Sequence, residues 1–339
     1  MIASAEPAHA TVLRDEVVDG LSIKNNGVYV DGTLGWGGHA AAILQHTAAR
    51  VIGIDRDPDA LAAARDRLGD RIETVHGRFA ELPSILESLS IPHVDGIVLD
   101  LGVSSPQLDR AERGFSFTRT GPLDMRMDPT HGPTALDLLR ELDDESLANV
   151  LFELGEERHS KKIARLIKEA VVADKVHTTT ELAAVVLQGI PTIEQRKSKI
   201  HPATRTFQAL RIAVNRELDQ LQTFLDAFPA LLAPDGRCAI ISFHSLEDRL
   251  VKNCFRDLAW TTSLPAHLAH QAGERVDAVC EPVTRKAVFA SDDEIARNPR
   301  ARSARLRVCR RTDAPVTPIN AGSPGHHPAS GTWRSRGRA

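Results

Sequence analysis

A glycine-rich turn between Asp31 and His39 has the composition best suited to a ligand site. It reads Asp-Gly-Thr-Leu-Gly-Trp-Gly-Gly-His and follows a short apolar run. Its glycines let the backbone turn tightly and approach a ligand at places where a Cβ atom would collide. We therefore expect this turn to lie against a bound small molecule.

Two further acidic residues end apolar runs later in the chain. Asp55 ends the second run, where a carboxylate can accept both ribose hydroxyls of an adenosine moiety. Asp100 ends the fourth run, beside the place where the strand order of an open α/β sheet reverses and ligands bind. Ordinary turn residues are the alternative interpretation. Together with the glycine-rich turn, the pattern favours a cofactor that contains adenosine.

Two cofactor classes fit the glycine-rich turn. Residues 35–40 match the loose dinucleotide pattern G-x-G-x-x-A, so a nicotinamide cofactor stays open on that match alone. In dinucleotide folds, however, the first glycine follows the strand almost directly and the pyrophosphate sits on the helix N-terminus. Here Asp31 and three further residues precede Gly35. Its carboxylate would repel a pyrophosphate but suits an amino-acid tail and a sulfonium, which favours S-adenosyl-L-methionine.

A Ser-Ser-Pro loop follows the fourth apolar run. Methyltransferases that act on exocyclic amino groups carry a short polar loop with proline at this position. The lone pair of such a nitrogen is delocalised, so acceptors that hold its N–H groups can direct it at the methyl group. Ser104, Ser105 and Pro106 are therefore the catalytic candidates, and an ordinary turn is the alternative.

The elements that position these residues alternate in the first hundred residues. Short apolar runs at 28–30, 51–54, 72–75 and 97–99 are typical of buried parallel strands. Helix patterns separate them, and Asp57-Pro58 gives a cap followed by proline at the first helical position. This alternation predicts an α/β fold with a doubly wound sheet.

The pattern changes to helices alone after residue 109. We expect a methyltransferase domain formed by residues 1–109 and 200–311, a helical insert at 110–199 that recognises the substrate, and a disordered tail at 312–339. Five apolar residues predict one long helix: Phe207, Leu210, Val214, Leu218 and Leu221. Later segments predict a strand at 238–243, a capping box from Ser245 to Asp248, and closing strands at 283–290 and 304–308.

Composition excludes several protein classes. The net charge is −3, so a nucleic-acid surface has to be local. The four cysteines are widely separated, which favours a reducing compartment and neither a zinc site nor a disulfide framework. Without a long apolar run or a signal-like N-terminus, we expect a cytoplasmic protein that needs no membrane and no metal.

Two basic runs contain no acid and could contact phosphates. One extends from Arg196 to Arg216, and the other from Arg300 to Arg311. The RNA-binding candidates in the first run are Arg196, Lys197, Lys199, Arg205 and Arg211. A solvated helix face is the alternative.

Three ring side chains are further candidates for contact with a base. Phe115 and Phe117 could stack on a base turned out of its helix, or could anchor the helical insert. His244 follows the fifth strand and could orient a base or relay a proton. A structural histidine at a helix start is an equal alternative.

Several longer blocks resemble the RsmH (MraW) methyltransferase family. They run in order over residues 9–311, and several are too long to be chance matches. The blocks lie at 31–39, 55–58, 99–109, 113–117, 121–127, 155–158, 201–211, 242–249 and 298–303.

The resemblance implies a class I methyltransferase fold with a helical insert after the fourth strand. It implies N4-methylation of a cytidine in the decoding region of small-subunit (16S) ribosomal RNA, within the small ribosomal subunit or its precursor, using S-adenosyl-L-methionine. It also implies cofactor contacts at Gly37, Gly38, His39, Asp55, Phe79, Asp100 and Gln107. A methyltransferase for a protein or small molecule, and a non-catalytic ribosome-assembly factor, are the remaining alternatives.

Overall fold

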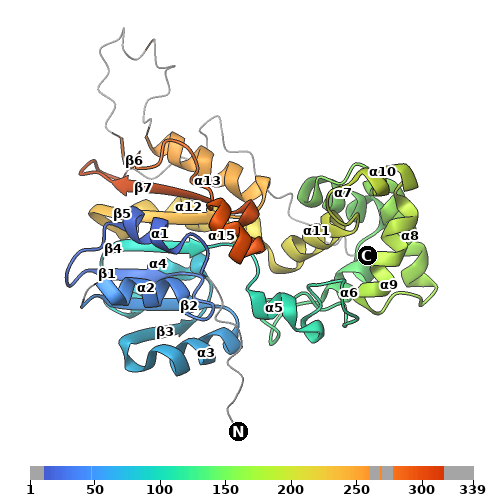
Figure 1. Ribbon diagram of the computed structural model, residues 1–339, viewed down its shortest axis with the longest axis horizontal. Coiled ribbons are helices and arrows are strands. Elements are labelled where there is room, and N and C mark those ends of the chain that lie inside the picture. The colour runs from blue at the N-terminus through green and yellow to red at the C-terminus, as the bar shows by residue number, and fades with distance from the viewer. Residues whose placement is uncertain (1–10, 47, 260–267, 269–277, 317–339) are drawn as a thin grey trace, which may run out of the picture. The chain divides into compact units, whose positions relative to one another are not determined.

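The computed structural model describes residues 11–46, 48–259, 268 and 278–316. Within these ranges the chain divides into two compact units (Figure 1). The sheet unit takes in the described residues up to Gly102 and from Asp219 onward, and the helical unit is Val103–Leu218. No helix among the described residues is long and apolar enough to cross a membrane.

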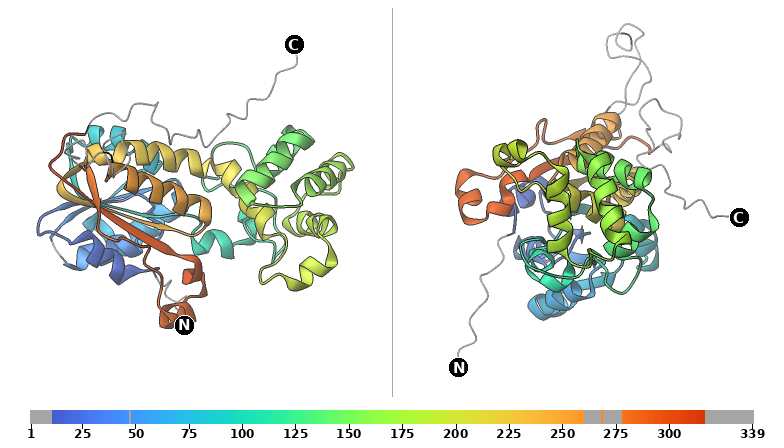
Figure 2. Two further views of the ribbon diagram at one scale, coloured as in Figure 1. Left: turned by 90° about the horizontal axis from the view of Figure 1, so that it is seen from above. Right: turned by 90° about the vertical axis from the view of Figure 1, so that its right-hand side faces the viewer.

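A sheet of seven strands, counted over the described residues, forms the centre of the sheet unit. In spatial order the strands are β3 (Ile72–His76), β2 (Arg50–Asp55), β1 (Val28–Asp31), β4 (Val94–Asp100), β5 (Leu232–Ser242), β7 (Arg305–Arg311) and β6 (Cys280–Pro282). The pairs from β3 to β5 are parallel, while β7 pairs antiparallel with β5 and β6 (Figure 2). The strand order reverses between β1 and β4, so the predicted doubly wound α/β sheet is confirmed.

Helices cover both faces of this sheet because side chains alternate along each strand. Ile97 and Leu99 of β4 belong to one core and Val98 to the other. The first core is covered by α4 (Leu82–Ser88), α12 (Glu217–Leu231) and α13 (Ser245–Leu258). The second is covered by α1 (Arg14–Leu21), α2 (Gly38–His46) and α3 (Pro58–Leu68), of which α2 lies in front of the sheet in Figure 1. Shorter helices complete the unit: η1 (Gly69–Arg71), η2 (Phe79–Glu81), α15 (Asp292–Arg297) and η4 (Pro299–Ser303).

The helical unit has a core of its own, built on α7, α8, α9 and α11. Its elements are α5 (Ser105–Asp109), η3 (Ala111–Arg113), α6 (Ala135–Glu141), α7 (Asp144–Gly155), α8 (Ser160–Val172), α9 (Thr179–Gly189), α10 (Thr192–Lys197) and α11 (Thr204–Asn215). The helix α8 lies against both α7 and α9 (Figure 2). Close packing of α7 on α11 requires Gly155, because a Cβ atom there would lie 2.6 Å from the carbonyl oxygen of Arg205.

The predicted single helix from Phe207 to Leu221 is wrong because the chain breaks at Arg216. Its φ angle is 51°, in the left-handed region, and α11 ends there. The separate helix α11 buries its apolar face against α7, so it belongs to the helical unit. The compact helical unit therefore begins earlier and ends later than the insert expected at 110–199.

Three local expectations in the last third of the chain also differ from the structure. Residues 283–290 form no strand: Val288 makes an isolated bridge to Leu306, and the edge strand is β6 at 280–282, which pairs with residues 309–311 of β7. The capping box of α13 begins one residue earlier than predicted, at His244. The tail was expected to be disordered from residue 312, yet the backbone N–H of Thr312 donates to Val279 over 3.1 Å and Val316 packs on the core. Residues 317–339 lie outside the described part of the chain.

Candidate functional site

Asp31 joins the end of β1 to the start of α2. Its two carboxylate oxygens accept the backbone N–H groups of Thr33 and Ala40, at 3.3 and 3.1 Å. The side chain is 1% exposed, and this burial raises the pKa of Asp31 to about 6, although nearby His39 opposes the shift. A carboxylate with this role both shapes the turn and presents negative charge at the strand end.

The glycine-rich turn is held against three strand ends. Besides the bonds to Asp31, the N–H of Gly35 donates to Asp55 over 2.7 Å, and the N–H of Asp100 donates to the hydroxyl of Thr33 over 2.6 Å. Gly37 has a φ angle of 72°, and a Cβ there would lie 2.8 Å from Leu68. The turn is therefore held in place by its hydrogen bonds, and at Gly37 and Gly38 neighbouring side chains lie too close for a Cβ atom.

Asp55 at the end of β2 has room for a ligand hydroxyl pair. One carboxylate oxygen accepts the N–H of Gly35 and the other accepts the N–H of Asp57 over 2.8 Å. A carboxylate offers about four acceptor positions, so both oxygens can accept a further donor. Burial raises the pKa of Asp55 to about 6.

The buried side chain of His39 lies beside the partly buried carboxylate of Asp100. The Nε2 atom of His39 lies 3.7 Å from Oδ2 of Asp100, which is longer than a hydrogen bond. Among the described residues, neither ring nitrogen of His39 nor Oδ1 of Asp100 has a hydrogen-bond partner. Burial lowers the pKa of His39, but the Asp100, Asp31 and Glu294 carboxylates outweigh burial and the pKa is raised.

We call Asp31, His39, Asp55 and Asp100 the strand-end cluster. Unsatisfied buried polar atoms are costly, and a polar ligand would satisfy those of His39 and Asp100. The acids suit an ammonium, a sulfonium and ribose hydroxyls, while a protonated imidazole suits a carboxylate. The residues present therefore fit S-adenosylmethionine.

Two further predicted cofactor contacts, Phe79 and Gly38, also belong to the sheet unit. Phe79 in η2 is half-buried and packs edge-on against Phe224, with ring centroids 5.9 Å apart. A Cβ on Gly38 would collide with the side chain of Thr11, so the N-terminal segment covers this glycine closely. An adenine contact for Phe79 stays a prediction.

The Ser-Ser-Pro loop begins helix α5 of the helical unit. Ser104 is the N-cap: its hydroxyl accepts the N–H of Gln107 over 3.4 Å, and Oε1 of Gln107 accepts the N–H of Ser104 over 3.0 Å. Ser105 and Gln107 are buried. Gln107 thus has a local structural role, which the spacing S-x-x-Q could have revealed from the sequence.

His244 is the N-cap of α13 and is paired with Glu247. Its Nδ1 accepts the N–H of Glu247 over 3.5 Å. Its buried Nε2 lies 3.1 Å from Oε1 of Glu247 but makes no hydrogen bond with any described residue. The other carboxylate oxygen accepts the N–H of Phe243 over 2.8 Å. The contact of Glu247 with His244 was missed from the sequence, because the capping box was placed one residue too late.

The two aromatic candidates have different environments. Phe115 is buried in the core of the helical unit, which favours the anchoring alternative over base stacking. Phe117 is partly buried and stacks on His201 with ring centroids 4.5 Å apart, next to Phe207. Neither position had a sequence signal that distinguished core from surface.

Of the five RNA-binding candidates in the first basic run, all but Arg211 are exposed. Arg196, Lys197, Lys199 and Arg205 are all exposed. Arg211 instead makes two hydrogen bonds to Glu217, at 2.8 and 2.9 Å, and its side chain is 16% exposed. This pairing argues against a phosphate contact for Arg211.

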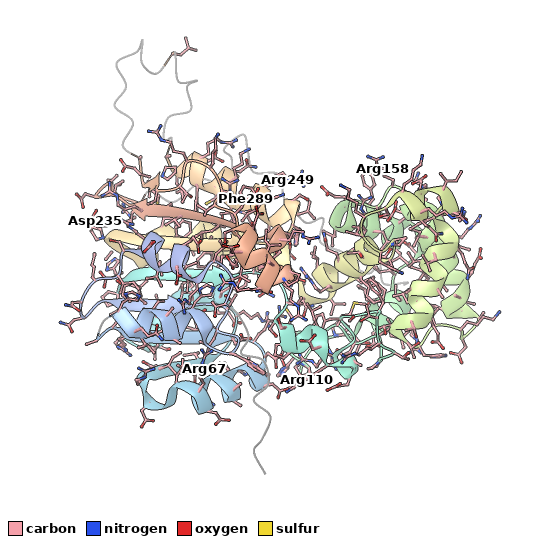
Figure 3. The ribbon with its side chains drawn as sticks, in the orientation of Figure 1. Arg67, Arg110, Arg158, Asp235, Arg249 and Phe289 are labelled. Carbon is pink, nitrogen blue, oxygen red and sulfur yellow. The ribbon has the colours of Figure 1, made fainter. Side chains whose placement is uncertain are left out.

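Part of the second basic run is paired with acids from distant segments. Arg307 bonds to Asp248 over 2.7 Å, and Arg310 pairs with Glu281 over 2.6 Å and with Asp235, which Figure 3 labels. For these arginines of β7 the acid-free appearance of the run in the sequence was therefore misleading. Arg300 and Arg302, which precede β7 in η4, are exposed.

Comparisons with known proteins agree with this geometry. The model of the MraW methylase family matches residues 6–312. A protein of Sorangium cellulosum named ribosomal RNA small subunit methyltransferase H is 51% identical, over 89% of this chain and 90% of its own. A protein of the same name from Anaeromyxobacter dehalogenans is 52% identical, over 90% of this chain and 98% of its own.

One solved structure, an rRNA methylase from Streptococcus thermophilus, has a TM-score of 0.37 and 10% identity over 90% of this chain and 99% of that one, too remote for an inference. The family match covers nearly all of the described residues and the strand-end cluster within them. The chain belongs to the MraW methylase family.

Proposed function

We propose that the protein transfers a methyl group from S-adenosylmethionine to N4 of a cytidine in the decoding region of small-subunit (16S) ribosomal RNA. Methylation of ribosomal RNA follows from the family and from relatives about half identical along almost the whole chain. The cytidine and its N4 atom rest on the resemblance of the sequence blocks. The observation that carries the cofactor site is the strand-end cluster, whose polar atoms at His39 and Asp100 lack partners among the described residues.

The strand-end cluster binds the cofactor in this proposal. S-adenosylmethionine supplies a methyl group already activated by a positively charged sulfur. Asp55 accepts the ribose hydroxyls, while Asp31, His39 and Asp100 bind the charged amino-acid tail. The backbone at Gly37 and Gly38 allows close approach, Phe79 lies against the adenine, and Gln107 contributes a polar contact.

The Ser-Ser-Pro loop holds the amino group that is methylated. Ser104 and Ser105 supply oxygen acceptors, and Pro106 restricts the backbone that carries them. The chain passes from the end of β4 at Asp100 to Ser104 within a few residues, which supports this assignment. His244 orients the base or takes up a proton, with Glu247 fixing its ring.

The helical unit recognises the RNA. Arg196, Lys197, Lys199 and Arg205 contact phosphates, which positions the substrate without reading its sequence. Phe117 stacks on a nearby base. The partner is the small ribosomal subunit or its precursor, and a ribosomal substrate implies a cytoplasmic protein.

Mass spectrometry of small-subunit rRNA tests this function. A strain without the gene should lack one methyl group on a cytidine, and the intact gene should restore it while Asp55→Ala should not. Unchanged rRNA in the deletion strain would point to a protein or small-molecule substrate. If Asp55→Ala rescued subunit assembly as well as the intact gene did, an assembly factor would be the better description.

A further inference from the structure

The helical unit contains a pocket formed where five of its helices begin or end, including α9, whose C-cap Ile190 lines it. The pocket measures about 110 Å³ and is lined by residues from the end of α7, the start of α8, the segment around α10 and the start of α11. A buried water needs about 10–15 Å³, so there is room for a group of several heavy atoms. Of the residues given roles above, only Arg205 lines it.

Two unpaired arginines line this pocket. Arg158 and Arg205 are exposed, and within the described part of the chain neither guanidinium makes an ion pair or hydrogen bond. Figure 3 labels Arg158 at the edge of the helical unit near α7 and α10. Arginine binds phosphate through two parallel hydrogen bonds, so two free guanidinium groups at one pocket favour an anionic ligand.

Two acidic residues that line the same pocket further restrict the chemical class of ligand that fits it. Glu194 already has a partner inside the protein, because its carboxylate lies 3.0 Å from Nε2 of His159. Glu157 is 3% exposed and accepts the backbone N–H of His159 over 2.9 Å. A carboxylate has further acceptor positions, so Glu157 suits a ligand that carries a hydroxyl donor beside its anionic group. A ribose with its phosphate has both.

The helix ends at this pocket also favour an anion. The N-cap residues of α8 and α11, His159 and Ala203, provide no side-chain hydrogen bond, and neither helix has an acid in its first turn. By contrast, α7 and α9 of the same unit have capping side chains and acids there. At α8 the neighbouring carboxylate of Glu157, which accepts the N–H of His159, offsets part of this positive charge. At α11, where Nδ1 of His201 accepts the N–H of Ala203, the helix start has no acid in its first turn.

The pocket brings together two sequence blocks that the cofactor site does not use. Arg158 belongs to the block 155–158, and Arg205 belongs to the block 201–211. They meet because Gly155 allows α7 to pack closely on α11. On α10, Arg196 and Lys197 add positive charge one to two residues from the lining residue Gln195, and Lys199 follows between the lining residues Ser198 and Ile200.

We propose that this pocket binds one ribose–phosphate unit of the substrate RNA, with Arg158 and Arg205 on the phosphate and Glu157 accepting the ribose 2′-hydroxyl. The inference rests on the proposed RNA substrate and adds a contact that distinguishes RNA from DNA. That distinction follows because the 2′-hydroxyl is the donor that DNA lacks.

Binding of labelled oligonucleotides to the full chain tests the proposal. The probes are a fluorescent RNA with the decoding-region sequence and a DNA of the same sequence, titrated over a salt series. The double variant Arg158→Gln with Arg205→Gln should lose about tenfold or more in RNA affinity, and the slope of log affinity against log salt should fall by about one to two. Arg165→Gln, on the exposed face of α8, is the matched control and should bind as the unchanged protein does.

The 2′-hydroxyl contact has a separate test. The unchanged protein should bind RNA more tightly than DNA, and Glu157→Ala should reduce that ratio while circular dichroism shows an intact fold. Glu157→Gln keeps one acceptor oxygen and should retain most of the preference.

Unchanged RNA affinity and salt slope in the double arginine variant would overturn the pocket assignment. An equal loss for RNA and DNA in Glu157→Ala would overturn the ribose contact. Either failure would leave the proposed function standing if the unchanged protein still methylated small-subunit rRNA. Absence of that methylation together with a normal RNA preference would instead overturn the function and keep the pocket.

Discussion

The imidazole Nε2 of His39 lies 3.7 Å from a carboxylate oxygen of Asp100, at the ends of α2 and β4 that meet beside the glycine-rich turn. Both groups carry buried polar atoms without hydrogen-bond partners among the described residues. A bound ligand that satisfies these atoms gains more than it would from solvated groups, because water no longer competes for them.

Replacing His39 with Asn should therefore weaken S-adenosylmethionine binding by about tenfold to a hundredfold, the cost of one hydrogen bond to a charged group. His46 lies on the exposed end of the same helix, so His46→Asn is the matched control and should bind normally. Isothermal titration calorimetry measures both. Equal affinity of the two variants would remove His39 from the site.

Asp55→Ala should weaken cofactor binding by about 1.5–3 kcal/mol, because a charged acceptor of ribose hydroxyls is lost. The same change frees the N–H groups of Gly35 and Asp57, so its effect on folding has to be measured by thermal denaturation. Asp66→Ala, on the exposed side of α3, controls for the loss of an acid. Normal affinity in a folded Asp55→Ala protein would contradict the assignment, and tighter binding of NAD than of S-adenosylmethionine would contradict the cofactor itself.

Cofactor affinity should fall as the pH drops through about 6. Burial raises the pKa of both Asp31 and Asp55 to about 6, so the free protein takes up protons there while the cofactor requires the ionised carboxylates. The stability of the cofactor-free protein should change in the opposite direction. A carboxyl group whose pKa is raised in the folded state lowers the free energy of unfolding as the pH rises through that pKa. Calorimetry in buffers of different ionisation enthalpy should detect proton release on binding near about pH 5.5 and almost none near about pH 8. Proton release of equal size at both values would contradict this role.

The ion pair between Arg211 and Glu217 should matter for stability rather than for RNA. Both side chains are largely buried, so Arg211→Ala leaves a carboxylate without its partner and should lower the free energy of unfolding by about 3 kcal/mol. Arg205→Ala, on the exposed side of the same helix, should keep full stability and lose RNA affinity. Urea denaturation should therefore show a loss of stability in Arg211→Ala alone, and RNA titration should show a loss of affinity in Arg205→Ala alone. A stable Arg211→Ala protein with weakened RNA binding would restore Arg211 to the RNA surface.

The parallel strands and their terminal acids could be predicted because both are local patterns. Each strand from β1 to β4 contains a short apolar run, and Asp31, Asp55 and Asp100 follow those runs directly. The apolar runs identify the strands. Because these strands are parallel, the residues that follow them all lie at the same edge of the sheet.

The sequence could not show which basic residues have acidic partners, because those partners lie elsewhere in the chain. Glu217 reaches Arg211 only because Arg216 adopts a left-handed conformation, which no residue type in that stretch signals. Asp248 reaches Arg307 from 59 residues away. Burial of Phe115 likewise depends on how the helices pack, so sequence reasoning left its role open.

The Ser-Ser-Pro loop carries the prediction with the greatest consequence, since it assigns the chemistry. Ser104 caps α5, so Ser104→Ala should cost about 1 kcal/mol of stability in addition to an acceptor. Ser105 is buried at the first helical position and is not the N-cap, so Ser105→Ala tests the acceptor without removing the cap of α5. Pro106→Ala should loosen the backbone that aligns both. Misplacement by about 1 Å costs on the order of a hundredfold in rate, so single-turnover methyl transfer to small-subunit particles should slow strongly in all three variants while cofactor affinity stays near normal. If transfer slowed only in Ser104→Ala, and in proportion to its lost stability, the loop would be a helix cap and His244 with Glu247 would become the leading catalytic candidates.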